Sequence, residues 1–403
     1  MSVDEAQERI LAAVTPVEDE MVSLDQAVGR ALAHPVTASV DLPPFANSAM
    51  DGFAVRSEDL QQRGEPTVRL QVTHHIGAGS ADPGRISARQ AARIMTGAPM
   101  PEGGDTVIPF EDTESGDNWV AVPVGVARGS AVRPARLDVK RGQVVVERGV
   151  RLTARHIAMA AGVGCGELRV SRRPVVGILA TGDELVEPGL PLQPGQIYNS
   201  NAHALRAAVA ELGAVPLTLG PVKDEPEALR RVLENGREAD LLLTSGGVSV
   251  GDFDYVKSVL EDLGRVEFWR VRVRPGKPLM LAWLQRPNGG ETMVLGLPGN
   301  PTSTMVTFYV FARPVIRRLL GLAEPLPDPL SAVADEELDN QGGRETFFRV
   351  IVQPREGRLH ARLAGKQDSS MILPLSRANA LARVPASVAR LQPGATVDVY
   401  PLD

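Results

Sequence analysis

The chain has 403 residues, of which 43% are hydrophobic and 23% charged. This ordinary composition excludes disordered, collagen-like and low-complexity proteins, and the length predicts roughly two to four domains. The net charge of −6 argues against a nucleic-acid partner, and the absence of a long uninterrupted apolar run argues against a membrane-spanning segment.

The start of the chain and its cysteine content indicate a cytoplasmic protein. The first residues, from Met1 to Ala6, are acidic where a secretory signal would be basic and then apolar. The single cysteine, Cys165, cannot form a disulfide within the chain, and no zinc-type spacing of cysteine and histidine occurs. We therefore expect a reducing compartment, and chemistry carried by carboxylates, hydroxyls, arginines and lysines.

The first 42 residues predict two helices. Ser2 and Glu5 form a capping box in front of a stretch with apolar residues on one helical face, and a second short helix begins near Ser23. Short apolar runs and glycine-rich turns at 137–170 are interpreted as a return to this unit. We therefore assign residues 1–42 together with 137–170 to a first domain.

Residues 43–136 predict a second, β-rich domain. An irregular loop with two prolines opens it, and alternating apolar and polar residues follow, as is typical of strands. One helix is expected inside this domain, with Ser87 and Gln90 as its cap pair and Gly97 as its end.

The stretch 171–324 predicts a doubly wound α/β domain. It opens with the continuous apolar run Val175–Ala180, which is typical of a buried parallel strand. Helices and strands then alternate at the spacing of such a sheet. The helices are expected near 199–213, 225–236, 253–263 and 300–320, and the strands near 215–219, 240–245, 266–273, 278–284 and 292–297. A proline-rich segment precedes a fourth, β-rich domain at 325–403.

Four polar, glycine-bearing loops follow the predicted strands of the α/β domain. Ligands of open α/β sheets bind beyond the carboxyl ends of the strands, so we expect these loops to converge. Gly246 and Gly247 let a ligand approach the backbone closely, and Asn300 with Pro301 suits the start of a helix. Free N–H groups at such a start favour an oxyanion. The loops are 180–185, 244–255, 270–278 and 297–301.

Charged residues of both signs accompany these loops. Arg270, Arg272 and Arg274 would share one face of a strand, and together with the following Lys277 they would suit a polyanion. Acidic residues beside a phosphate site suggest Mg²⁺. These acids are Asp183, Glu184, Asp224, Asp252 and Asp254. Each loop taken alone is compatible with an ordinary turn, and the arginines with a salt-bridged surface strand, but the combination favours phosphoryl-type chemistry.

Six motifs occur in an order that resembles one known family. They are Asn47–Ala54, Met95–Pro99, Thr181–Leu185, Ser245–Ser249, Pro275–Pro278 and Leu297–Pro301. Each motif is weak alone, but together they span most of the chain. The set resembles the molybdopterin molybdenumtransferases, the MoeA type that is also seen as the E domain of gephyrin.

The resemblance implies the last step of molybdenum cofactor synthesis. In this step adenylylated molybdopterin and molybdate react, with Mg²⁺, to give the molybdenum cofactor and AMP. It also implies an elongated homodimer whose subunits have four domains, the third similar to molybdopterin adenylyltransferases and the fourth a small β-barrel. The cleft would lie between the third domain of one subunit and the second domain of the other. A molybdopterin adenylyltransferase is the expected upstream partner.

The resemblance and the loop chemistry together imply a set of site residues. The catalytic positions would be Asp51, Thr96, Asp138 and Glu184. The metal positions would be Glu184, Asp224 and Asp254. The substrate-binding positions would be Arg133, Ser245, Gly246, Gly247, Ser249, Arg270, Arg274, Lys277, Pro298, Gly299, Asn300, Pro301, Arg344 and Ser369.

The sequence departs from the family pattern at four positions, and two alternative functions remain open. Ala46 and Asn199 stand where aspartates are common, and Arg270 and Arg274 replace lysines, which changes the donor geometry. One alternative is an ATP-dependent molybdopterin adenylyltransferase, against which the extra domains argue. The other is a gephyrin-like scaffold that binds peptides, against which the lack of a long linker argues. The choice between molybdate and tungstate also stays open.

Overall fold

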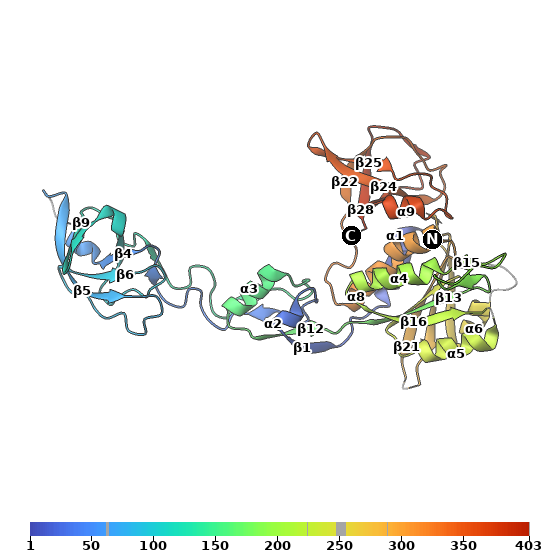
Figure 1. Ribbon diagram of the computed structural model, residues 1–403, viewed down its shortest axis with the longest axis horizontal. Coiled ribbons are helices and arrows are strands. Elements are labelled where there is room, and N and C mark those ends of the chain that lie inside the picture. Colours follow the sequence, from blue (N-terminus) through green and yellow to red (C-terminus); the bar gives the residue numbers. More distant parts are fainter. Residues whose placement is uncertain (62–63, 224, 247–254, 288, 403) are drawn as a thin grey trace.

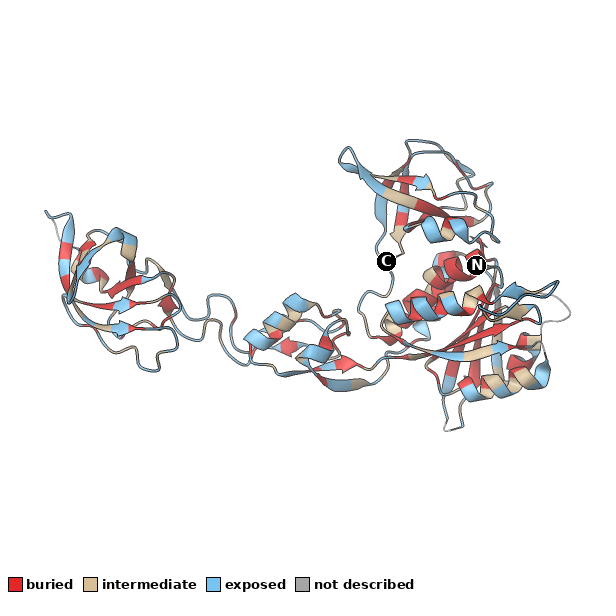
Figure 2. Cartoon of the chain, viewed as in Figure 1, coloured by how far each residue is buried: buried red, intermediate tan, exposed pale blue. Residues whose placement is uncertain are grey.

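The computed structural model describes residues 1–61, 64–223, 225–246, 255–287 and 289–402. The molecule is elongated (Figure 1): a β-rich unit lies at one end, a small central unit follows, and an α/β unit and a β-barrel lie together at the other end. Buried residues gather inside each unit, whereas the segments that join the units are mostly exposed (Figure 2). None of the described helices is both long and apolar enough to cross a membrane.

The α/β unit is built on a six-stranded sheet. In spatial order its strands are β16 (Val215–Val222), β13 (Val175–Thr181), β17 (Leu241–Ser245), β21 (Glu291–Leu297), β20 (Pro278–Gln285) and β18 (Gly264–Arg270). The first four run parallel, and the last two form an antiparallel edge. The central strands are buried on both faces, as their continuous apolar runs predict. The predicted α/β architecture is confirmed.

Helices cover both faces of this sheet. One face packs on α1 (Val3–Ala12), α4 (Ser200–Glu211), α7 (Pro301–Thr307) and α8 (Arg313–Leu319), and the other on α5 (Pro226–Gly236) and α6 (Tyr255–Leu263). The N-cap hydroxyl of Ser2 accepts a hydrogen bond from the Glu5 N–H at 3.2 Å, which starts α1 where the sequence predicts. Although the sequence analysis assigned α1 to the first domain, it packs with α8 in the α/β core through Ala6 and Ile10.

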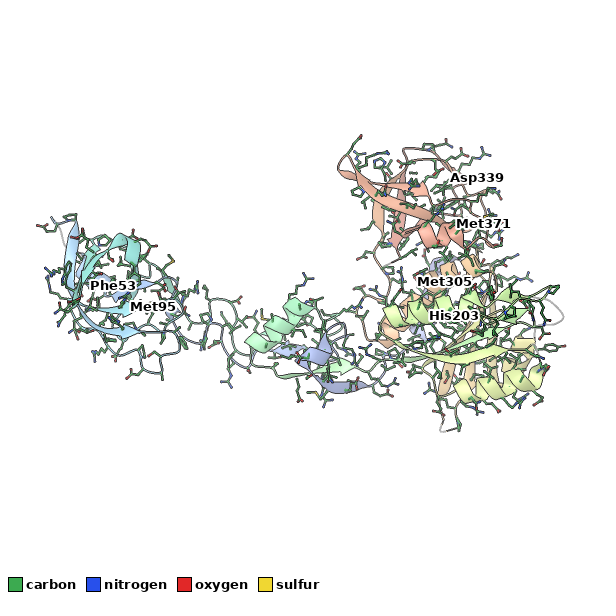
Figure 3. All side chains as sticks on the ribbon, viewed as in Figure 1. Phe53, Met95, His203, Met305, Asp339 and Met371 are labelled. Atoms are coloured by element: carbon green, nitrogen blue, oxygen red, sulfur yellow. The ribbon has the colours of Figure 1, made fainter. Side chains whose placement is uncertain are left out.

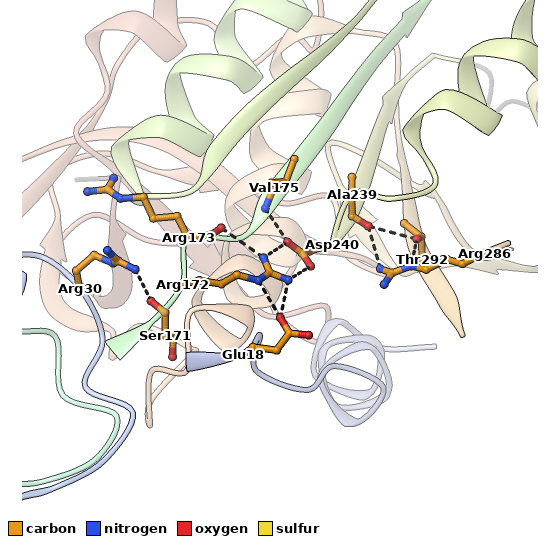
Figure 4. Close-up of polar contacts among 10 residues, drawn as sticks. All are labelled: Glu18, Arg30, Ser171, Arg172, Arg173, Val175, Ala239, Asp240, Arg286 and Thr292. Atoms are coloured by element: carbon orange, nitrogen blue, oxygen red, sulfur yellow. Dashed lines mark hydrogen bonds and ion pairs between the residues drawn. The ribbon is translucent and has the colours of Figure 1, made fainter. Parts of the chain in front are cut away.

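The central unit is small and connects to the α/β unit through an ionic junction. It contains β1 (Asp19–Ser23) paired with β12 (Glu167–Ser171), β2 (Val36–Thr37) paired with β11 (Val144–Val146), and the helices α2 (Leu24–Ala27) and α3 (Ala154–Gly162). Arg172, between β12 and β13, donates to both carboxylate oxygens of Asp240 at 2.7 Å and also to Glu18 at 2.8 Å (Figure 4). The contact joins the central unit to the start of β17.

The β-rich unit contains a six-stranded sheet. Its order is β7 (Thr106–Pro109), β4 (Gly52–Val55), β6 (Gln90–Ile94), β5 (Thr67–Ile76), β9 (Trp119–Pro123) and β8 (Glu114–Gly116). The helix expected after Ser87 is wrong, because this segment is strand β6, paired with β4 and β5. The Ser87 N–H does bond to the Gln90 Oε1 at 2.9 Å, but that contact closes a turn. Two full strand ladders outweigh the helical preference of the local sequence.

The C-terminal unit is a closed five-stranded barrel. Its strands are β22 (Leu330–Ala334), β24 (Glu345–Arg355), β25 (Arg358–Leu363), β26 (Ala380–Val384) and β28 (Thr396–Pro401). The ring closes through β24 and β26. Strand β19 (Val273–Arg274) leaves the α/β unit and pairs with β24, and the barrel residues Phe347 and Leu381 belong to the same apolar core as α1 and α8. The barrel is therefore packed firmly against the α/β unit.

Candidate functional site

A pocket of about 990 Å³ lies at the carboxyl ends of β13, β17 and β21, where the α/β unit meets the barrel. Ligands of open α/β sheets are expected to bind beyond the carboxyl ends of the parallel strands. The structure brings together here many residues that the sequence analysis selected. They are Glu184, Ser245, Gly246, Arg274, Lys277, Pro298, Gly299, Asn300, Pro301, Arg344 and Ser369. In Figure 3, His203 marks α4 on one side of this region and Met371 marks the barrel on the other.

Two glycines allow the pocket loops to approach one another. Gly246 has a φ of +91°, and a Cβ at this position would lie 3.1 Å from the carbonyl oxygen of Thr181. Gly276 has a φ of +107°, and its Cβ would lie 2.3 Å from a methyl carbon of Thr307. Side chains at either place would be strained and would push the loops apart. Gly246, one of the two glycines predicted to permit a close approach, therefore packs against the end of β13, and Gly276 packs against α7, whereas Gly247 lies outside the described residues.

The barrel supplies one wall of the pocket. Asn300 Nδ2 donates to Ser369 Oγ at 3.3 Å, and Thr302 Oγ1 donates to the Met371 carbonyl at 2.6 Å. Beneath this wall the buried Arg349 donates to the carbonyls of Lys366 and Asp368 at 3.3 and 3.1 Å. The loop that carries Ser369 is thus held from below by one guanidinium group.

Basic side chains reach the pocket from two units, but not as the single row that was expected. Strand β18 ends at Arg270, and the chain then crosses to the barrel, where Arg274 belongs to β19. Arg270 is exposed and lies outside the pocket lining, so the prediction of one continuous strand face is wrong. Arg274 donates to the Asn340 carbonyl and to Gln341 Oε1 at 3.3 and 3.2 Å. Lys277 and Arg344 also line the pocket.

The described residues do not by themselves form a metal site. Within the described ranges no group of three or more aspartate, glutamate, histidine or cysteine side chains is placed to hold an ion. Glu184 is exposed and lines the pocket. Asp183 is also described and is exposed, whereas the remaining selected acids, Asp224, Asp252 and Asp254, and two loop residues, Gly247 and Ser249, lie outside the described residues.

A second group of selected residues lies in and beside the β-rich unit. The Asp51 Oδ1 accepts hydrogen bonds from the N–H and the hydroxyl of Thr96 at 2.7 and 2.8 Å. The backbone and side-chain donors of Thr96 hold the pKa of the Asp51 carboxyl below its usual value. Arg133 belongs to the same unit: it lies on β10 (Val132–Arg133), which pairs with β3 (Asn47–Ser48), and β3 ends three residues before Asp51.

This second group is separated from the pocket within one chain. Asp138 lies on the segment that returns toward the central unit, where its N–H donates to the Leu42 carbonyl at 2.9 Å. Met95, the neighbour of Thr96, marks the group at the far end of the molecule in Figure 3, opposite to His203 and Met371. The side chains of Asp51, Thr96, Arg133 and Asp138 are all exposed.

Two asparagines lie at the start of α4, and the contacts of Asn201 were not predicted from the sequence. Asn201 Nδ2 donates to Ser245 Oγ at 2.8 Å and to the Gly299 carbonyl at 2.7 Å, and Asn201 lines the pocket. Asn199 caps α4, and its Nδ2 donates to Glu187 Oε1 at 3.0 Å. An aspartate at 199 would repel Glu187, which accounts for the amide at this departure. The polar run in front of a predicted helix at the sheet edge was the available signal.

The fold and the pocket define an elongated multidomain α/β protein with basic side chains at the ligand-binding edge of its parallel sheet. Three family models match the chain in order. They are the MoeA N-terminal region (domains I and II) at residues 1–164, a probable molybdopterin binding domain at 177–318, and the MoeA C-terminal region (domain IV) at 331–402.

Similar proteins agree over the full length. A molybdopterin molybdenumtransferase of Nostoc sp. is 41% identical, over 96% of this chain and 89% of its own, and one of Bacillus subtilis is 37% identical, over 98% and 93%. A crystal structure of the molybdopterin biosynthesis MoeA protein from Pyrococcus horikosii has 30% identity and a TM-score of 0.85, covering 100% of this chain and 99% of its own. The chain belongs to the molybdopterin molybdenumtransferase family.

Proposed function

We propose that this protein transfers molybdenum from molybdate to adenylylated molybdopterin and releases AMP. The observation that carries the proposal is the pocket, which combines the predicted glycine loops with basic side chains from two units in a family member. Both substrates are anions, and a pocket of about 990 Å³ is large enough for a compound of nucleotide-pterin size.

Electrostatic placement accounts for the chemistry that these residues can perform. Release of AMP is the hydrolysis of a phosphoanhydride: water forms the new P–O bond as the bridging P–O bond breaks, so negative charge develops on phosphate oxygens. Positive side chains and hydrogen-bond donors that are fixed before the reaction stabilise this charge. Lys277 and Arg344 are placed for that role, and Ser245 and Ser369 offer hydroxyl groups on two sides of the same pocket. Rate enhancement then comes from positioning and charge stabilisation, without a protein nucleophile.

We also propose that the reaction depends on Mg²⁺. Among the described residues only Glu184 of the proposed ligands is present at the pocket. Magnesium coordinates carboxylate oxygens and would offset phosphate charge. Glu184→Gln tests this part, because AMP release at the full rate would remove Glu184 from the site.

We also propose that a second copy of the chain completes the site. Asp51, Thr96 and Arg133 lie in the β-rich unit and Asp138 lies on the segment that leaves it, apart from the pocket of their own chain. In a homodimer the β-rich unit of one subunit would bring them to the pocket of the other, where Asp51, Thr96 and Asp138 would position the pterin or molybdate.

Mixed dimers test this arrangement. Asp51→Asn and Lys277→Ala chains would each be inactive alone, because every site lacks one residue. When the two are mixed and allowed to exchange, about a quarter of the wild-type activity is expected, since half of the dimers are mixed and each has one intact site. No recovery after confirmed exchange would place both groups in the same chain and refute the shared site.

The direct test of the activity uses purified protein with adenylylated molybdopterin and Mg²⁺. We expect AMP to appear upon addition of molybdate, and parallel reactions with tungstate and sulfate would measure anion selectivity. Failure to release AMP with every oxyanion would refute the proposed activity. We further propose a cytoplasmic location and a molybdopterin adenylyltransferase as the upstream partner, because the substrate must first receive its adenylyl group.

A further inference from the structure

The first turn of α4 carries a side chain that joins two loops of the pocket. Asn201 Nδ2 lies 2.8 Å from Ser245 Oγ and 2.7 Å from the carbonyl oxygen of Gly299. Ser245 ends β17 and Gly299 follows β21, which are neighbouring parallel strands. All three residues line the pocket. One amide group therefore connects a helix start with the ends of both strands.

The chemistry of the partners fixes the orientation of this amide. A carbonyl oxygen only accepts hydrogen bonds, so the NH₂ group of Asn201, and not its oxygen, must face Gly299. The second hydrogen of the same NH₂ group is then donated to Ser245 Oγ. Both distances are normal or short for N–H···O bonds.

This contact decides how Ser245 can act. A serine hydroxyl has one hydrogen to donate, and an oxygen that already accepts from Asn201 keeps that hydrogen available. Ser245 is only 3% exposed, and a buried hydroxyl needs a partner. Among the hydrogen bonds of the described residues, none takes the Ser245 hydroxyl as donor. Since Ser245 lines the pocket, an acceptor on a bound ligand would satisfy it.

We propose that Asn201 is a positioning residue that fixes Ser245 as a hydrogen-bond donor to an anionic oxygen of the substrate. The identification of that oxygen as a nucleotide phosphate rests on the proposed function. Asn201 also holds the Gly299 backbone, so it sets the width of the gap that the phosphate enters. An aspartate at 201 would reverse the direction of the hydrogen bond with Ser245, because a carboxylate accepts the Ser245 hydrogen; it would also repel the Gly299 carbonyl.

The test is a double-mutant cycle with AMP as the probe, measured by isothermal titration calorimetry on the full-length protein. Asn201→Asp is nearly isosteric, and we expect AMP binding to weaken on the order of tenfold or more, the effect of losing a hydrogen bond to a charged group. Ser245→Ala alone should weaken it similarly. Because Asn201 acts through Ser245, Asn201→Asp should have much less effect on AMP binding when Ser245→Ala is already present.

A matched control separates the added charge from the lost contact. Asn199→Asp places the same charge at the same helix end; it loses its own contact with Glu187 but has none with Ser245, so its effect should add to that of Ser245→Ala. In steady-state assays Asn201→Asp should raise the KM for adenylylated molybdopterin more than it lowers kcat. Thermal unfolding of each variant verifies the fold, and Ser245→Ala tests the donor role even if Asn201→Asp does not fold.

The outcomes discriminate between the two proposals. Additive effects of Asn201→Asp and Ser245→Ala, or AMP binding by folded Asn201→Asp equal to that of the wild type, would overturn the positioning role. Wild-type AMP binding that Ser245→Ala leaves unchanged would overturn it as well. If the wild-type protein does not bind AMP and releases none from the substrate, the proposed function itself fails.

Discussion

The junction between the central and α/β units gives a prediction whose magnitude follows from its geometry. Asp240 is 11% exposed in its side chain and accepts three hydrogen bonds at 2.7 Å, two from the Arg172 guanidinium and one from the Val175 N–H (Figure 4). Asp240→Asn would remove the charge and one acceptor while keeping the volume. Arg172 would then lose the charged bidentate contact with residue 240, although it keeps its ion pair with Glu18.

The expected loss of folding free energy is smaller than that for a fully buried ion pair. Breaking a buried ion pair costs about 3–5 kcal/mol, but Arg172 is 34% exposed, so water offsets part of the loss. We therefore expect Asp240→Asn to lower the free energy of unfolding of the α/β unit by roughly 2–4 kcal/mol. For a unit of this size that corresponds to a fall of roughly 5–10 °C in its thermal midpoint.

The assay is differential scanning calorimetry, with the α/β transition resolved from the others because a multidomain chain does not unfold in two states. Glu18→Gln is the matched control: its side chain is 79% exposed and also contacts Arg172, so it should cost no more than about 1 kcal/mol. If Asp240→Asn destabilised the unit no more than Glu18→Gln, the bidentate contact would not be a stabilising connection and the reasoning would be wrong.

Three further predictions address the core, the barrel wall and the β-rich unit. Ile10→Ala should lower the free energy of unfolding of the α/β unit by about 2–5 kcal/mol, because α1 is part of that core. Destabilisation of a different unit in the calorimetric scan would contradict this assignment. Arg349→Met should loosen the loop that carries Ser369, measured as faster amide hydrogen exchange there and weaker AMP binding without global unfolding. Thr96→Val should raise the pKa of Asp51, followed by NMR titration, because one of its two donors is removed. Stability from the Asp51–Thr96 contact should be present above the unfolded pKa of Asp51 and lost as the pH falls through its lowered folded pKa; an unchanged titration would refute the contact.

The α/β unit was predictable because its signals are local. The apolar run at Val175–Ala180 needs burial on both faces, and Ser2, Asn199 and Pro301 mark helix starts through caps and backbone preferences that do not depend on distant residues. The same logic placed the glycine loops at one sheet edge, since parallel strands end together.

The errors arise where distant parts of the chain decide the structure. The segment after Ser87 has a helical local pattern, yet its partners β4 and β5 come from elsewhere in the sequence and make it a strand. The spacing of Arg270 and Arg274 fits one face of a single strand, but β19 pairs with the barrel strand β24, so the two arginines lie on different strands. Asn201 was missed because its role depends on Ser245 and Gly299, which local spacing does not bring together.

The separation of the two candidate groups limits how the protein can work. The pocket combines the α/β unit with the barrel, and these two share one apolar core, so they cannot part without exposing residues such as Phe347. The β-rich unit has no share in that core, and its own residues pack in separate clusters. Movement of one chain could bring Asp51 to its own pocket only by folding the β-rich unit back across the central unit. A second copy needs no such change, so the separation of the two groups supports the proposed site shared between subunits.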